Sequence, residues 1–225
     1  MPALTENLLL QVASVIRDEV TTTDELIPSG ETASYRSNPY KISEFTLIRK
    51  DPQYVGRAKA AQEFEKARVA GDKEKAGTFY QVLKAVGVDT PVEELMKTTG
   101  IGSVLYAKRP GDGSAREYAA SCQKVLGGLA NICIEYVTKR YRSNCVNWGI
   151  LPFTCPEKEI VLEPGEYLYL PGIRKAVEDG ATRFTAKVIG KDGAIRDLEL
   201  ELNGVTEAEK KVLLAGSLIN SYKEA

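Results

Sequence analysis

A strand, a glycine-rich loop, a helix and a second strand follow one another in the middle of the chain. Residues 103–107 are a short apolar run, and residues 111–117 read Gly-Asp-Gly-Ser-Ala-Arg-Glu. We expect a helix over residues 115–126 and a second apolar strand over residues 129–136. Such a unit forms a parallel strand pair with a crossover helix. The chain is therefore predicted to be an α/β protein.

The loop at residues 111–117 has the composition of an anion-binding turn. Gly111 and Gly113 allow tight turns, and a following helix directs unpaired N–H groups and its positive dipole end toward the loop. Ser114 and Arg116 lie where a carboxylate or phosphate would bind. The same residues also fit the S-x-x-E capping box that begins many ordinary helices. These seven residues alone support both interpretations.

Length and charge limit the classes of protein to consider. The chain has 225 residues, 43% of them hydrophobic, which suits one large domain or two small ones. Its 30 basic and 31 acidic residues give a net charge of -1, which favours neither nucleic acid nor an anionic membrane as a partner. Polar residues interrupt its apolar clusters, which are too short for a membrane span or a signal peptide. We expect a soluble, cytoplasmic protein.

Histidine is absent and cysteine is scattered. The absence of histidine removes the commonest general base and zinc ligand, and any catalytic triad that contains histidine. The four cysteines, Cys122, Cys133, Cys145 and Cys155, form no C-x-x-C pair, which argues against a zinc ribbon or a redox site. With no secretion signal, we expect buried, reduced thiols. Chemistry in this chain must use other side chains or a borrowed centre.

The first half of the chain contains one ambiguous apolar run and one helical stretch. Residues 7–17 fit either a strand or a helix, and residues 20–43 have the composition of a loop. Residues 53–86 are rich in helix formers interrupted near Gly71 and Gly77, which predicts two helices in a hairpin.

The second half is predicted to be richer in strands. Residues 91–99 indicate a short helix, and residues 160–170 are apolar around a Pro-Gly turn. The runs at 183–189 and 195–202 flank an Asp-Gly turn, which predicts a hairpin. A second capping box at residues 206–209 begins the last helix.

Three further segments share their order with motifs of one protein family. They are residues 24–38 (DELIPSGETASYRSN), 141–153 (YRSNCVNWGILPF) and 213–222 (LLAGSLINSY). Together with the glycine loop they resemble the aconitase superfamily, where TTD-x-I-x-P-x-G, RSN, G-x-G-S-S-R-E and RSN-x5-GILP segments recur in this order. The similarity is to the C-terminal swivelling domain of aconitases and to the small subunit of isopropylmalate dehydratases. It covers nearly the whole chain and is weakest over residues 54–90.

This resemblance implies a domain organisation. We expect a three-layer β/β/α swivelling domain whose mostly parallel central sheet is flanked by helices, with a barrel-like β part built from the late strands. Residues 1–19 are expected to be a linker or interdomain segment and residues 20–225 the swivelling domain, with a helical insertion at 53–90. The abrupt opening at Met1 resembles the start of a domain fragment.

The resemblance also implies a reaction. The family's hydro-lyases remove water from, and return it to, a small hydroxy di- or tricarboxylate such as citrate or isocitrate at a 4Fe-4S cluster. No cysteine trio here resembles the family's cluster ligands, so we expect the cluster on other domains of the same protein or on a large subunit. The chain alone would bind no metal and be inert. Two alternatives stay open: a free small subunit of an isopropylmalate dehydratase-like heteromer, and a non-catalytic module that binds RNA or another partner.

The motif positions assign residue roles by resemblance. Ser114 corresponds to the family's base, and Arg36, Arg116 and Arg142 are expected to bind substrate, although Arg142 fits an ordinary surface role equally well. The expected supporting residues are Thr23, Asp24, Ser37, Asn38, Gly111, Gly113, Ala115 and Asn144. Ala115 departs from the family, because most members have a second serine there. Either the substrate or the turnover is therefore expected to differ.

Overall fold

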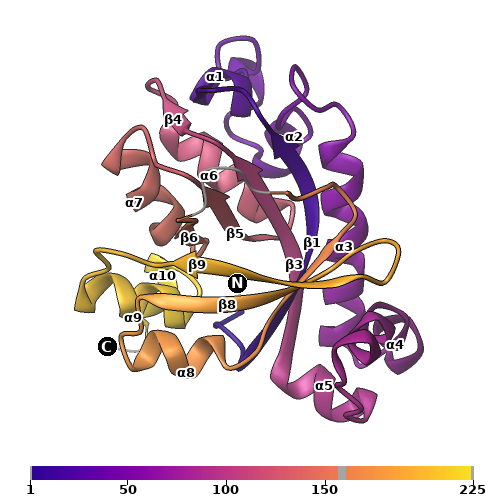
Figure 1. Cartoon of the computed structure of the whole chain (residues 1–225). Helices are drawn as coiled ribbons and strands as arrows, with labels where there is room; N and C mark the ends of the chain where they lie inside the picture. Colours follow the sequence, from indigo (N-terminus) through magenta and orange to yellow (C-terminus); the bar gives the residue numbers. More distant parts are fainter. Residues whose placement is uncertain (1, 157–160, 224–225) are drawn as a thin grey trace.

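Seven strands form one closed barrel within residues 2–156 and 161–223, the part of the chain that the computed structural model describes. Their order around the barrel is β1-β3-β5-β6-β9-β8-β7. The strands are β1 (Asn7–Ile16), β3 (Thr99–Ala107), β5 (Gly128–Cys133), β6 (Leu151–Thr154), β7 (Tyr167–Leu170), β8 (Arg183–Ile189) and β9 (Ile195–Glu201). Figure 1 shows β8 and β9 crossing in front of the strands from the first half of the chain.

The barrel is mixed. Strands β1, β3, β5 and β6 pair in parallel, whereas β7, β8 and β9 pair antiparallel with one another, and β7 and β9 join the parallel strands at β1 and β6. The α/β class is confirmed, but the structure does not show the expected mostly parallel central sheet, because the parallel strands and the late antiparallel strands form one closed barrel. The late strands close the sheet onto β1 and β6, which pairs the strand edges that an open sheet would expose.

Strand β1 lies between β3 and β7 in this barrel. Its residues Leu8, Leu9 and Leu10 are fully buried, and a run buried on both faces explains why periodicity alone could not separate strand from helix. The segment expected to be a linker, residues 1–19, therefore contains a barrel strand. Residue 1 lies outside the described residues.

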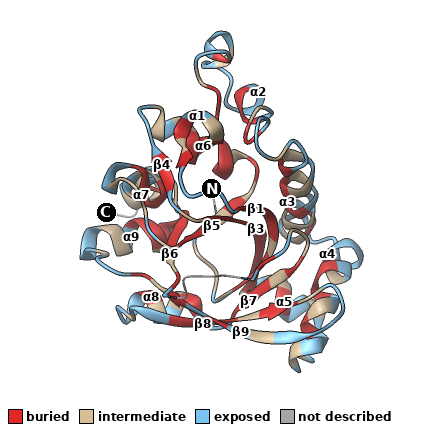
Figure 2. Ribbon diagram, turned by 45° about the horizontal axis from the view of Figure 1, so that its top comes forward, coloured by how far each residue is buried: buried red, intermediate tan, exposed pale blue. Residues whose placement is uncertain are grey.

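Helices connect the strands and cover the barrel. They are α1 (Thr23–Leu26), η1 (Ala33–Tyr35), α2 (Pro39–Ser43), α3 (Tyr54–Ala70), α4 (Lys73–Tyr80), η2 (Gln81–Val86), α5 (Val92–Thr98), α6 (Arg116–Val125), α7 (Lys139–Asn147), α8 (Ile173–Glu178), α9 (Glu207–Ala215) and α10 (Leu218–Ser221). Residues 20–43, expected to be loop, thus hold several short elements. No helix in the described ranges is long and apolar enough to cross a membrane. Figure 2 shows the buried residues concentrated along the barrel strands and on the inner faces of the helices.

The helical stretch at 53–86 forms the predicted hairpin. Helix α3 ends at Gly71, whose φ of +81° closes the helix in the left-handed conformation, and Asp72 caps α4 by accepting a hydrogen bond from the backbone N–H of Lys75. The expected break at Gly77 is wrong, because Gly77 lies inside α4. Helix α3 packs on β1 and β3 and so attaches the insertion to the barrel.

Two predicted strands have different bounds in the structure. Strand β3 begins at Thr99 rather than near residue 103, so Gly100 and Gly102 lie within it. A Cβ atom at Gly102 would lie 2.6 Å from the Leu129 side chain, so close packing rather than a turn explains that glycine. The strand predicted over 129–136 is β5, which ends at Cys133. The apolar segment at 160–170 contains β7, and residue 160 lies outside the described residues. The β8–β9 hairpin and the capping box of α9 are confirmed.

Candidate active site

The glycine loop follows β3, at the end where anions bind in α/β units. Its first residues form β4 (Pro110–Asp112), which pairs in parallel with β2 (Thr21–Thr22). The backbone N–H of Thr21 also donates to the carbonyl oxygen of Arg109 at 3.0 Å. This pairing places the first motif segment directly beside the glycine loop.

The two glycines of the loop fit between α1 and α7 because they have no side chains. Gly111 has a φ of +102° and Gly113 a φ of +124°, values that L side chains rarely adopt. A Cβ atom at Gly111 would lie 2.6 Å from the Tyr141 side chain, and one at Gly113 would lie 2.3 Å from Thr23 Oγ1. Three of the motif segments therefore meet at this loop.

Ser114 does not cap the helix that follows it. The N-cap of α6 is Ala115, no side chain caps the helix, and Ser114 is exposed. Glu117 accepts a hydrogen bond from Trp148 Nε1 at 3.1 Å. The capping-box interpretation of these residues is wrong, and the Ser114 hydroxyl lies at the loop surface.

Arg116, the first residue of α6, carries an incompletely satisfied guanidinium group. Its Nε atom is buried and has no hydrogen-bond partner among the described residues. A buried donor without a partner costs about 1–3 kcal/mol. An anion bound at the start of α6 would satisfy this donor and would also meet the positive end of the helix dipole.

Arg36 packs against the first turn of α6. Its guanidinium carbon lies 5.9 Å from the centroid of the Tyr118 ring, and its NH2 group donates to the Ser29 carbonyl oxygen at 3.3 Å. With Glu117 and Trp148 it also lines a pocket of about 120 Å³. Two of the predicted substrate-binding arginines, Arg36 and Arg116, thus lie at the same end of α6.

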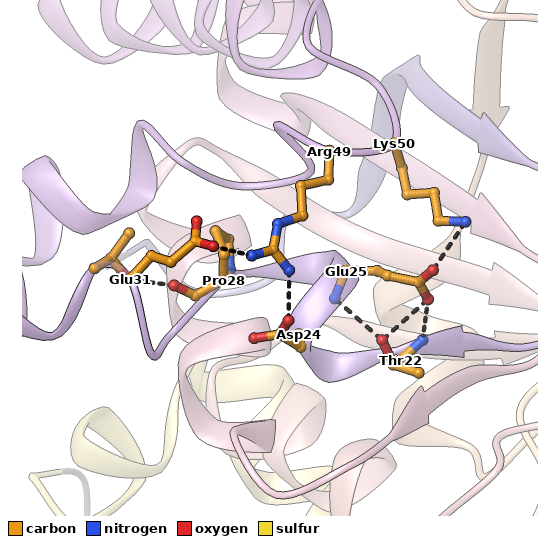
Figure 3. Close-up of polar contacts among 8 residues, drawn as sticks. Thr22, Asp24, Glu25, Pro28, Glu31, Arg49 and Lys50 are labelled. Atoms are coloured by element: carbon orange, nitrogen blue, oxygen red, sulfur yellow. Dashed lines mark hydrogen bonds and ion pairs between the residues drawn. The ribbon is translucent and has the colours of Figure 1, made fainter.

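Ion pairs fix the segment after α1 in place. Asp24 accepts a hydrogen bond from Arg49 NH1 at 2.6 Å, and the same guanidinium binds Glu31 (Figure 3). Asp24 therefore braces this segment through a side chain 25 residues further along. No local pattern in the sequence marks Arg49 as its partner.

A complete capping box begins α1. The backbone N–H of Glu25 donates to Thr22 Oγ1 at 3.1 Å, and the Glu25 carboxylate accepts from the Thr22 backbone N–H at 2.7 Å. Lys50 Nζ lies 2.8 Å from Glu25 Oε1. Figure 3 shows this ion pair beside the capping box. These contacts hold Thr23, the residue against which Gly113 packs, at the start of the helix.

Other predicted residues have partners away from the loop. Arg142 lies 3.1 Å from Glu209 Oε1 and donates to the Asn203 carbonyl oxygen, so it joins α7 to α9. Asn38 caps α2, since its Oδ1 accepts from the Lys41 backbone N–H at 3.0 Å. Ser37 is exposed beside Asn38, and Asn144 lies half-buried in α7. Their expected roles stay predictions.

Thr138 contacts the glycine loop and is not among the predicted site residues. Its Oγ1 donates to the Gly111 carbonyl oxygen at 3.1 Å and accepts from the Tyr141 backbone N–H at 3.3 Å. It is the N-cap of α7, and a threonine just before a helical run is the sequence signal that could have identified it.

The described residues do not fit a 4Fe-4S cluster. Within residues 2–156 and 161–223 no group of three or more His, Cys, Asp or Glu side chains could hold a metal ion. All four cysteines are buried and free of disulfides. Burial raises the pKa of Cys122 and of Cys145 to about 12, which disfavours the thiolate form that binds metal.

Comparison with known proteins finds similarity to aconitate hydratases and to a homoaconitase small subunit. The chain is 27% identical over 207 residues to a mitochondrial aconitate hydratase from Arthroderma benhamiae, covering 89% of the chain and 24% of that protein. It is 35% identical over 95 residues to the homoaconitase small subunit of Thermus thermophilus, covering 42% of the chain and 58% of that subunit. No family model matches.

A solved structure shares the fold. The 3-isopropylmalate dehydratase (leuD) of Methanocaldococcus jannaschii aligns with a TM-score of 0.54 and 19% identity, covering 97% of this chain and 94% of that one. The fold is thus the mixed α/β fold of that protein. The chain is similar to members of the aconitase superfamily, and the resemblance that its motifs predicted is confirmed. It spans about a quarter of the aconitate hydratase and just over half of the homoaconitase small subunit.

Proposed function

We propose that the chain is the substrate-binding and base-donating part of an iron–sulfur hydro-lyase that acts on a small hydroxy di- or tricarboxylate. Its similarity to an aconitate hydratase and to a homoaconitase small subunit supports the reaction class. The cluster would be held by other domains or by a large subunit, because the described residues offer no site for it. Inactivity of the chain alone and a cytoplasmic location are parts of the same proposal.

The observation that carries this proposal is the free surface position of Ser114. A serine that only capped α6 would be engaged by the helix backbone, whereas here Ala115 holds the cap position and Ser114 is exposed. Its role would be to take a proton from the carbon next to a substrate carboxylate. A serine hydroxyl is a weak base, so its ionised form needs nearby positive charge. Arg116 and the start of α6 supply that charge.

Arg36 and Arg116 are proposed to bind the substrate carboxylates. Both come from motif segments, both contact or begin α6, and the unpaired Nε of Arg116 has capacity for an anion. A guanidinium suits this task because it binds a carboxylate through two parallel hydrogen bonds. Arg142 is the weakest member of the predicted set, since Glu209 already binds it.

Ala115 removes one donor from this site. In the position where most of the family has a second serine, the chain offers only a methyl group at the start of α6. The substrate is therefore proposed either to make one fewer hydrogen bond than in those members or to have a different group at that point.

Two assemblies fit the proposal. Similarity to one quarter of an aconitate hydratase supports a domain of a longer enzyme, and similarity to a homoaconitase small subunit supports a separate subunit. The coding sequence distinguishes them. A reading frame continuous with cluster-binding domains supports the first assembly, and a separate gene beside one for a large subunit supports the second.

The direct test removes the proposed base from the assembled, anaerobically reconstituted enzyme. We expect activity on at least one of citrate, isocitrate, isopropylmalate and homocitrate. Ser114→Ala should then lower kcat by about 10²–10⁴, the usual contribution of a positioned general base. Ser34→Ala, which removes another exposed hydroxyl, is the matched control and should keep wild-type activity.

Two results would contradict the proposal. A change within about twofold for Ser114→Ala would show that this serine is not the base. Inactivity of the assembled enzyme on all four substrates would remove the proposed substrate class. Iron content and the melting temperature should be measured for each variant, so that lost activity is not confused with lost assembly.

A further inference from the structure

A groove of about 980 Å³ lies between α3 and the end of α6. Gln62 Nε2 of α3 donates to the Val125 carbonyl oxygen at 2.7 Å and joins the two helices there. The apolar side chains that line it include Val69, Ile101, Val125, Leu126, Leu129 and Trp148. Its volume is at the upper end of the about 300–1,000 Å³ that small-molecule sites occupy.

Lys124 lines this groove and is buried, with only 8% of its surface exposed. Its Nζ donates to the Gly149 carbonyl oxygen at 3.2 Å, while an ammonium group has three donors. Burial lowers the pKa of Lys124 to about 8, and Glu65 only partly opposes the effect. The protein therefore keeps a buried cation that its own groups satisfy incompletely.

The other charged groups that line the groove already have partners. Glu65 accepts two hydrogen bonds of 2.7 Å from Arg68 and one of 2.9 Å from the backbone N–H of Ile101. On the rim, Lys59 pairs with Glu44, and Lys66 with Glu63. Among the described residues that line the groove, Lys124 is thus the lysine whose ammonium has no carboxylate partner.

We propose that the groove between α3 and α6 binds an organic monocarboxylate with an apolar body, whose carboxylate accepts hydrogen bonds from Lys124. The carboxylate is the negatively charged partner that the buried ammonium lacks. The apolar body of the ligand covers the apolar side chains that line the groove. Lys124 lies near the end of α6, away from the glycine loop at its start, although Trp148 also lines the pocket beside Arg36. The proposal does not depend on the hydro-lyase proposal.

Octanoate is a suitable probe, and octanamide, its uncharged counterpart, is the matched ligand control. Trp148 is the chain's single tryptophan and lines the groove, so its fluorescence reports binding directly. We expect saturable binding of octanoate to the full chain, weakened at least about tenfold in Lys124→Met and at least about tenfold for octanamide. Lys66→Met, at the rim, should bind octanoate as the wild type does.

A second measurement needs no variant and therefore does not depend on Lys124→Met folding. The wild-type chain is acetylated with acetic anhydride, with and without octanoate, and modified lysines are quantified by mass spectrometry. Octanoate should slow acetylation of Lys124 and leave that of Lys66 unchanged. Absence of saturable octanoate binding, equal binding of octanoate and octanamide, or unprotected Lys124 would each overturn the proposal.

Discussion

Helices α6 and α9 begin with the same sequence pattern and with different structures. In α9, Thr206 caps the helix, its Oγ1 accepts from the Glu209 backbone N–H at 3.2 Å, and the Glu209 carboxylate accepts from the Thr206 backbone N–H at 2.9 Å. In α6, Ser114 and Glu117 have the same spacing but form neither bond, and Ala115 is the N-cap. The pattern therefore caps α9, whereas at the start of α6 it leaves the Ser114 hydroxyl exposed.

The residues around each pattern explain the difference. Because α6 begins one residue later than the box requires, Glu117 is the second residue of the helix and binds Trp148 instead. Before it, Gly111 and Gly113 hold the backbone at positive φ between α1 and α7. Tertiary packing of the loop therefore overrides a local pattern, as functional sites commonly do.

The largest expected effect comes from filling the loop with Gly111→Ala. The added methyl would meet Tyr141, whose ring is fully buried and whose hydroxyl accepts hydrogen bonds from Gln123 and Asn131 at 2.9 and 3.1 Å. The ring cannot move without breaking those bonds. Overpacking and the positive φ together should lower the free energy of unfolding by about 3 kcal/mol, measured from the urea midpoint at unchanged slope.

Gly204→Ala, just before α9, is the matched control. Gly204 also has a positive φ, of +64°, but an added Cβ would meet nothing within 4 Å. Only the backbone strain of about 1 kcal/mol is expected there. If the two variants lose equal stability, the packing of the glycine loop against Tyr141 has no energetic weight, and our account of the α6 start fails.

The next prediction compares the loss of the Thr206 hydroxyl with the loss of the Ser114 hydroxyl. Thr206→Ala removes a working cap and should lower the free energy of unfolding by about 1 kcal/mol. Ser114→Ala removes an exposed hydroxyl with no capping bond and should change it by less than about 0.5 kcal/mol. Thermal or urea unfolding of both variants measures the difference. A loss for Ser114→Ala as large as for Thr206→Ala would mean that Ser114 does cap α6 in solution.

Local signals predicted those parts of the fold that depend on neighbouring residues. The β3–loop–α6–β5 unit, the β8–β9 hairpin and the α9 cap follow from turn residues and apolar runs close in sequence. Closure of the barrel did not, because β1 pairs with β7 across more than 150 residues, for example Leu8 with Leu170. The hydrophobic periodicity of a single sequence does not indicate which strands pair at that separation.

The candidate site divides in the same way. The order of the motifs predicted Thr23, Gly111, Gly113 and Ser114 as site residues. In the structure, Gly111 packs against Tyr141 and Gly113 against Thr23. The sequence could not show that Arg142 binds Glu209, 67 residues away, or that Ala115 rather than Ser114 is the N-cap of α6. Both depend on contacts between elements distant in the chain.

The smallest expected effect concerns α1, whose capping box includes Glu25. Burial raises the pKa of Glu25, but hydrogen bonds from Lys50 and Thr22 outweigh it, so the pKa in the folded protein lies below its ordinary value. The unfolded chain therefore binds more protons near and below pH 4.5, and this contribution to stability is lost as the pH falls through the folded pKa. Glu25→Gln should make the acid side of the stability–pH curve shallower. The effect should be slight, because such partly exposed pairs contribute little.

Urea unfolding at several pH values measures this change. Lys50→Met removes the strongest hydrogen bond that lowers the pKa of Glu25, so it should reproduce part of the change. Lys97→Met, at an exposed lysine on α5, is the control and should not. A Glu25→Gln curve parallel to the wild type would mean that protonation of Glu25 removes no stability from the α1 capping box.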